Sequence, residues 1–116
     1  MAWTIKQALA DKSITLVKRR IYNEYQFTVG ELKTIITIRT YKETEHGAYL
    51  FEQSHNIKTP VQISAYHTSR PWADYEAYAV HLAISGITQY YNEAVKAGHK
   101  PKEFWLIPNK RFVNMG

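Results

Sequence analysis

The chain has 116 residues, the size of one domain, and its 45% hydrophobic and 22% charged residues exclude collagen-like, disordered and acidic-tail proteins. It has no cysteine, which excludes disulfide frameworks, thiol nucleophiles, iron–sulfur clusters and cysteine-based zinc sites. We therefore expect one domain over residues 1–116, stabilised by packing alone.

Two features predict a cytoplasmic protein without a membrane partner. No apolar run approaches the roughly 18 residues that span a bilayer. Residues 1–7 also lack the basic and then apolar layout of a secretory signal.

The net charge of +5 is unevenly distributed along the chain. Residues 1–42 carry eight basic and three acidic groups, residues 43–95 carry two and six, and residues 96–116 carry five and one. If the two basic ends meet on one face, their field attracts phosphate backbones or an acidic protein surface. The alternative is that the charge serves solubility alone.

The first predicted elements are a short helix and the start of a sheet. Thr4 with Gln7 three residues later forms a capping box for a helix that runs to about Lys12. The β-branched and aromatic residues between Ser13 and about Tyr66 predict the sheet, in which one strand has apolar residues at alternate positions from Ile21 to Val29. A turn at residues 30–31 joins it to a second strand over residues 34–41, so we expect an antiparallel hairpin.

The second half of the chain predicts further strands and one long helix. Residues 48–54 form a third strand, and residues 61–66 form either a fourth strand or an extended approach to the helix. The helix spans about Pro71 to Ala97, with Thr68 or Ser69 as its cap, an apolar stripe at spacings of three or four, and Gly98 after its end. A last strand covers residues 104–107.

This order predicts an α+β fold: an antiparallel sheet of three to five strands packed on one long C-terminal helix, with a short N-terminal helix, in the order α-β-β-β-(β)-α-β. The helix covers one face of the sheet. Because antiparallel sheets often leave their other face in water, we expect the functional surface there.

Cations and aromatic rings alternate on two of the predicted strands and return at the C-terminus. Arg and Lys neutralise phosphates while exposed rings stack on bases, so this mixture is typical of nucleic-acid-binding sheets. The alternative is that the tyrosines are buried and the charges protect a solvated edge. The predicted nucleic-acid-binding residues are Lys18, Arg19, Arg20, Tyr22, Tyr25, Arg39, Lys42, Lys110 and Arg111.

A second surface is predicted on the long helix. Tyr75, Tyr78 and Tyr90 fall outside its apolar stripe, and interfaces are enriched in Tyr, Trp and Arg. We expect these three rings to form a contact with a partner protein or a homodimer contact. The alternative is a second buried face against the N-terminal helix.

No pattern predicts a catalytic site, a metal site or a cofactor. His46 follows Glu43 and Glu45, but these side chains lie along a predicted exposed turn with no fourth ligand nearby. His67 begins one half of the paired motif of two-histidine phosphoesterases, and the other half is missing. No nucleophile elbow, phosphate-binding glycine loop or dinucleotide fingerprint occurs. We therefore expect a non-enzymatic protein.

Two functional hypotheses follow. The first is a basic module that binds nucleic acid through the sheet. The second is a protein-binding inhibitor or adaptor, of the type that phages and mobile elements encode, which covers an acidic surface of its partner. They differ in salt dependence, since phosphate binding releases counterions and weakens steeply with added salt.

Overall fold

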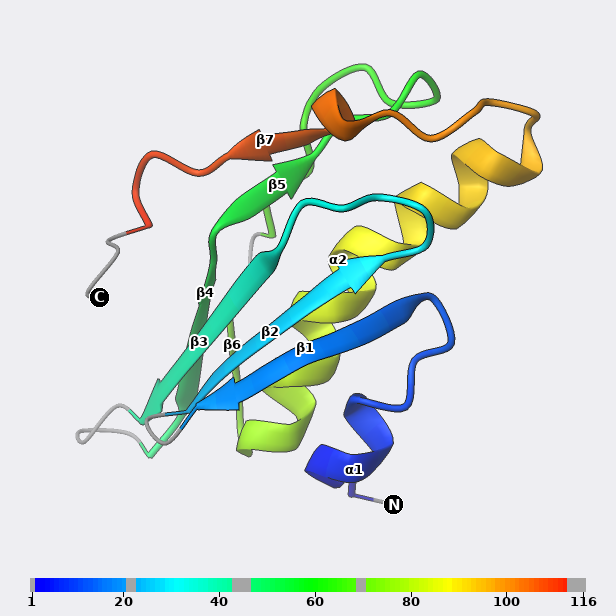
Figure 1. Ribbon diagram of the computed structural model, residues 1–116. Helices are drawn as coiled ribbons and strands as arrows, with labels where there is room; N and C mark the ends of the chain where they lie inside the picture. The colour runs from blue at the N-terminus through cyan, green and yellow to red at the C-terminus, as the bar shows by residue number, and fades with distance from the viewer. Residues whose placement is uncertain (1, 21–22, 43–46, 69–70, 113–116) are drawn as a thin grey trace.

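A computed structural model describes residues 2–20, 23–42, 47–68 and 71–112, with backbone alone for residues 16–20 (Figure 1). The predicted fold class is confirmed, because an antiparallel sheet packs on one long helix and a short helix precedes it. The elements are α1 (Ile5–Ala8), β1 (Ile14–Arg20), β2 (Glu24–Val29), β3 (Ile36–Lys42), β4 (Tyr49–Gln53), β5 (His55–Ile57), β6 (Trp72–Ala73), α2 (Glu76–Lys96), η1 (Glu103–Trp105) and β7 (Leu106–Pro108).

The main sheet has five strands in the order β1-β2-β3-β4-β6, all antiparallel, and α2 crosses one of its faces (Figure 1). Strands β5 and β7 form a separate two-stranded ladder beyond the end of β4. The core lies between the sheet and α2, where Phe27, Ile38, Val80 and Ile84 are buried. The other face of the sheet is the face that the sequence predicted to be open.

The capping box that predicted α1 is confirmed. The Thr4 hydroxyl accepts from the Gln7 N–H at 3.1 Å, and the Gln7 side chain accepts from the Thr4 N–H at 2.9 Å. The helix ends at Ala8, earlier than expected, and the Asp11 carboxylate then accepts from the Ser13 N–H at 2.8 Å. Such local bonds give the backbone an alternative to the helix, which explains the early end.

The first part of the sheet differs from the prediction. The expected strand from Ile21 to Val29 begins at Glu24, and a separate strand, β1, precedes it and pairs with it. Between the two lies Asn23, whose φ of 56° is left-handed. Asn adopts this conformation more readily than most residues, so it suits a reversal between two strands. The pairing of β2 with β3 is as predicted.

The start of the long helix also differs from the prediction. Trp72–Ala73 form β6, which pairs with β4, and α2 begins only at Glu76 after Tyr75. The caps expected at Thr68 or Ser69 are therefore wrong for Thr68, and Ser69 lies outside the described residues. The N–H of Phe51 donates to the carbonyl of Pro71 at 3.0 Å, so pairing with β4 holds this segment extended.

The segment after β5 and the last strand of the chain also differ from the prediction. Residues 61–66 form a turn, bends and irregular backbone, so the alternative of a fourth strand there is wrong, and the strand β5 precedes them instead. The last strand is shifted to Leu106–Pro108, because Glu103–Trp105 form the single turn η1. No helix within the described part of the chain is long and apolar enough to cross a membrane.

Candidate functional site

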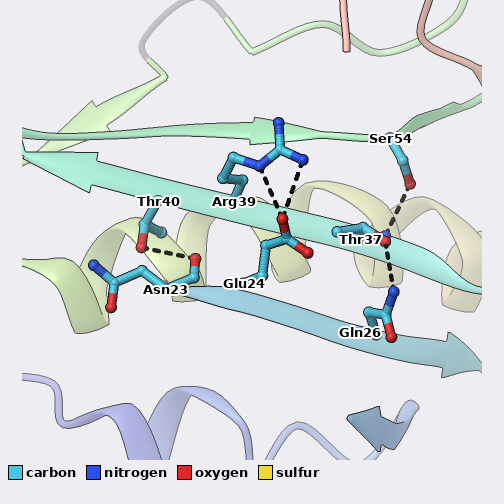
Figure 2. A network of polar contacts seen from close by, with 7 residues as sticks. All are labelled: Asn23, Glu24, Gln26, Thr37, Arg39, Thr40 and Ser54. Carbon is cyan, nitrogen blue, oxygen red and sulfur yellow. Dashed lines mark hydrogen bonds and ion pairs between the residues drawn. The ribbon is translucent and has the colours of Figure 1, made fainter. Parts of the chain in front are cut away.

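Polar side chains occupy the face of the sheet that points away from α2. In β3 the buried Thr40 donates to Glu76 of α2 at 2.7 Å, so the alternate residues Arg39 and Tyr41 lie on the opposite face. Figure 2 shows Arg39 joined to Glu24 of β2: its Nε and Nη2 both lie 3.1 Å from Glu24 Oε2. The charge of Arg39 is therefore balanced within the sheet.

The same balance extends along a row across four strands. The register places Arg20 opposite Glu24, Glu24 opposite Arg39, and Arg39 opposite Glu52, so basic and acidic residues alternate across the sheet. Opposite charges on paired positions stabilise neighbouring strands. Arg39 is therefore flanked by acidic residues on both neighbouring strands, so it does not contribute an unpaired positive charge to the predicted basic and aromatic face.

The structure corrects the prediction for Tyr25 and separates Lys42 from Arg39. Tyr25 is 1% exposed and lies in the core, so the interpretation of its ring as a stacking surface is wrong. Lys42 alternates with Tyr41 and lies on the other side of the strand, with its Nζ 5.7 Å from the Tyr49 ring centroid. It does not join Arg39.

For Lys18, Arg19 and Arg20 in β1, the structure gives the position of the backbone. Lys18 pairs with Gln26, Arg19 with Tyr25 and Arg20 with Glu24. Tyr22 lies outside the described residues. These residues remain predictions.

The C-terminal segment comes back to the sheet and is held there by a turn centred on Asn109. Its N–H donates to the Ser54 carbonyl at 2.8 Å, and its side-chain amide donates to the Gln53 carbonyl at 2.9 Å. The Asn109 side-chain oxygen then accepts from the Arg111 N–H at 3.1 Å. These bonds fix the backbone that carries Lys110 and Arg111.

A groove of about 720 Å³ opens between this turn, the end of β4 and the segment before β6. A cavity of this volume is within the range of about 300–1,000 Å³ that holds small ligands. Its described lining residues are Tyr41, Leu50, Phe51, Glu52, Gln53, Asn56, Ala65, His67, Thr68, Pro71, Ile107, Pro108, Asn109, Lys110 and Arg111.

The lining combines two cations, a histidine and one exposed tyrosine ring with a single acidic side chain among the described residues. These are Lys110, Arg111, His67, Tyr41 and Glu52. The Tyr41 ring is 40% exposed, and its hydroxyl donates to Glu52 at 2.7 Å. Burial, followed by the hydrogen bond to Glu52 and the charge of Glu52, raises the pKa of Tyr41 to about 12. Like any tyrosine, Tyr41 is protonated at neutral pH, so its hydroxyl donates to Glu52 and this bond restrains the ring.

The three tyrosines predicted as one interface separate into two groups. The rings of Tyr75 and Tyr78 lie 5.9 Å apart, and that of Tyr78 lies 5.8 Å from His81. Tyr90 packs instead on Tyr66 at 5.0 Å, about 18 Å further along α2. The prediction of a joint patch is wrong for Tyr90.

The group around Tyr75 packs on the N-terminal segment. The Trp3 ring stacks on His81 with centroids 3.9 Å apart, and the Trp3 N–H donates to the Tyr75 hydroxyl at 2.5 Å. This arrangement agrees with the alternative of a second packed face, and it leaves Tyr78 as the exposed ring of the three.

Sequence reasoning missed two exposed apolar residues in the segments next to β5 and β7. Ile63 is fully exposed at 100% and Phe104 is 76% exposed. The carboxylate of Glu103 in η1 accepts from the N–H groups of Lys33 and Thr34, which brings the loop before β3 beside η1. In the sequence both apolar residues fall within apparent strand patterns, so no signal distinguished them from core residues.

No cluster of three His, Asp or Glu side chains that could hold a metal ion occurs within the described ranges. Glu43, Glu45 and His46 lie outside them. No known protein family, curated protein or solved structure matches this chain.

Proposed function

We propose that this protein is a non-enzymatic, cytoplasmic nucleic-acid-binding module whose site is the groove beside β4. The observation that carries the proposal is that Lys110 and Arg111, held by the Asn109 turn, line one groove with His67 and the half-exposed Tyr41 ring. The groove replaces the centre of the sheet as the binding site, because Arg39 is paired with Glu24 there.

The chemistry of the lining supports this function. Lysine and arginine neutralise phosphates and release their counterions, while an exposed ring supplies a stacking surface for a base. The negative charge of Glu52 opposes phosphate binding. Its carboxylate, however, accepts a hydrogen bond from the Tyr41 hydroxyl, and Glu52 pairs with Arg39 in the strand register, so part of this charge is balanced. The two cations on the turn are therefore the groups that we expect to contact the backbone.

The experiment is a titration of short labelled oligonucleotides at two ionic strengths. Replacing Lys110 and Arg111 together by Ala should weaken binding roughly tenfold and reduce the salt slope by about two. Replacing Lys96 and Lys100 by Ala removes the same charge from exposed positions at the other end of α2, and this control should bind nearly as wild type. Equal losses in both variants would show that net charge alone attracts the oligonucleotide.

A second candidate function, a protein-binding inhibitor or adaptor, is favoured by the exposed Ile63 and Phe104. Lys33, Lys58 and Lys102 are exposed in the same segments, so the partner surface would be apolar with an acidic rim. In this second function the protein would act by covering the surface of a larger protein, as expected for an inhibitor or adaptor of the phage or mobile-element type.

The test for this function is a pull-down in which Ile63 and Phe104 are replaced by Ser. A partner retained by wild type should be lost from this variant and kept by Val95→Ser, an exposed apolar residue on α2. Retention of the same partner by all three proteins would contradict the second function.

A further inference from the structure

We infer that the groove recognises an unpaired base, so that its ligand is single-stranded nucleic acid and not duplex. The inference rests on the proposed function and specifies its ligand. It is carried by an amide pair in the groove wall and by the Tyr41 ring, which are independent of the two cations.

The amide pair consists of Gln53 and Asn56, which both line the groove. The Gln53 Nε2 donates to the Asn56 Oδ1 at 3.2 Å, and Asn56 is only 7% exposed. Within the described part of the chain, the remaining donor of Asn56, Nδ2, and the remaining acceptor of Gln53, Oε1, have no side-chain or backbone partner. Neither atom is among the buried polar atoms that lack a partner, so both are open to the solvent of the groove, where a ligand can replace water as their hydrogen-bond partner.

A free donor and a free acceptor in one groove match the chemistry of a base edge. Every nucleobase offers a hydrogen-bond donor next to an acceptor on its pairing edge, and in a duplex the opposite strand occupies that edge. A ligand that satisfies Asn56 and Gln53 therefore has its base unpaired.

The Tyr41 ring supplies the second requirement. It lines the groove with its face partly exposed, and the bond to Glu52 limits its rotation. A ring held in this way stacks on a base at little conformational cost, whereas a base inside a duplex has both faces covered. Lys110 and Arg111 then lie in the same groove, where they can contact the flanking phosphates.

The experiment compares three probes of equal length: a single strand, a hairpin duplex and a strand of abasic phosphodiester units. Wild-type protein should bind the single strand at least tenfold more tightly than either of the others. Tyr41→Ala should lower affinity for the single strand about tenfold and leave the abasic strand unchanged. Tyr41→Phe keeps the ring and should retain most of the affinity.

Asn56→Ala gives a second measurement. It should weaken binding to the single strand by several fold and change the order of preference among homopolymers, while binding to the abasic strand is kept. Thermal melting checks that the variant is folded. Since Asn56 is buried, Tyr41→Ala decides the question if Asn56→Ala does not fold.

Failure of the inference differs from failure of the proposed function. Equal binding of all three probes, with loss in the Lys110 and Arg111 variant, would overturn the unpaired-base inference and leave nucleic-acid binding in place. No binding of any probe at low salt would overturn the proposed function itself.

Discussion

The guanidinium carbon of Arg39 lies 4.5 Å from the centroid of the Phe112 ring. Arg39 also pairs with Glu24, so a cation that the sequence suggested for phosphate binding instead joins β2, β3 and the C-terminal segment. The turn that carries Lys110 and Arg111 lies directly before Phe112. Arg39 therefore contacts the residue that follows the groove-lining Lys110 and Arg111.

Phe112→Ala should loosen the turn at Asn109. A cation–π contact at a partly exposed site contributes about 0.5–1 kcal/mol, so the loss of stability should be of that size. Hydrogen exchange at the backbone amides of Arg111 and Phe112 should become faster, and oligonucleotide affinity should fall by a few fold. Unchanged exchange at these amides would show that the Asn109 bonds suffice to hold the turn.

Gly30→Ala should be strongly destabilising. Gly30 has a φ of +51°, and an added Cβ would overlap the ring and hydroxyl of Tyr91, which accepts from the Glu31 N–H at 3.1 Å. Strain and displacement of the buried ring together should cost about 2–4 kcal/mol of unfolding free energy.

The matched control for this change is Gly47→Ala. Gly47 also has a positive φ, +71°, but no atom lies within 4 Å of the added Cβ. It should therefore cost only the backbone strain, about 1 kcal/mol. Urea denaturation measures both values, and equal losses would refute the role of Tyr91.

Stability should fall on acidification from pH 7.5 to 5.5 because of two histidines. Burial lowers the pKa of His55 and that of His81, although the nearby charge of Asp11 partly opposes the shift for His81. The unfolded chain thus binds more protons in this range, so unfolding becomes easier as pH falls below the ordinary value of about 6.5. Replacing both by Gln should flatten the dependence of the urea midpoint on pH. A midpoint slope identical to that of wild type would contradict this assignment.

Glu103→Gln should destabilise the chain at neutral pH. Its carboxylate accepts from the Thr34 hydroxyl at 2.7 Å and from the Lys33 and Thr34 N–H groups at 2.9 and 3.0 Å. The bond to the Thr34 side chain, and then those to the backbone, lower the pKa of Glu103. Because the group is exposed, we expect a loss of about 1 kcal/mol or less.

The pH dependence gives this prediction a direction. Because the pKa of Glu103 is lowered in the folded chain, its ionised carboxylate stabilises the fold at pH values above about 4.3, the ordinary pKa of glutamate. This stabilisation is lost as the pH falls through the lowered pKa and the carboxylate is protonated. The difference between wild type and Glu103→Gln, measured by urea denaturation, should therefore shrink towards pH 3. Glu31→Gln is the control for loss of an exposed carboxylate. A difference that stays constant with pH would argue against the charged bonds.

The sequence by itself determined the buried faces of the elements in which apolar residues recur at regular spacing. The apolar stripe at Ala77, Val80, Ile84, Ile87 and Ala94 is buried in α2, and Phe27, Val29, Ile36 and Ile38 are buried in alternation in β2 and β3. Local periodicity decides which face of a helix or strand is apolar, so these faces could be predicted. The capping box of α1 is equally local.

Only the tertiary structure decided the candidate site. The groove unites Tyr41, Asn56, His67 and Arg111, which lie far apart in the sequence, and β6 exists because Trp72–Ala73 pair with β4. Tyr25 and Arg39 belong to the same basic and aromatic pattern, yet one is buried and the other is paired with Glu24. Pairing register and the path of the C-terminal segment depend on contacts between distant residues, which no local pattern contains.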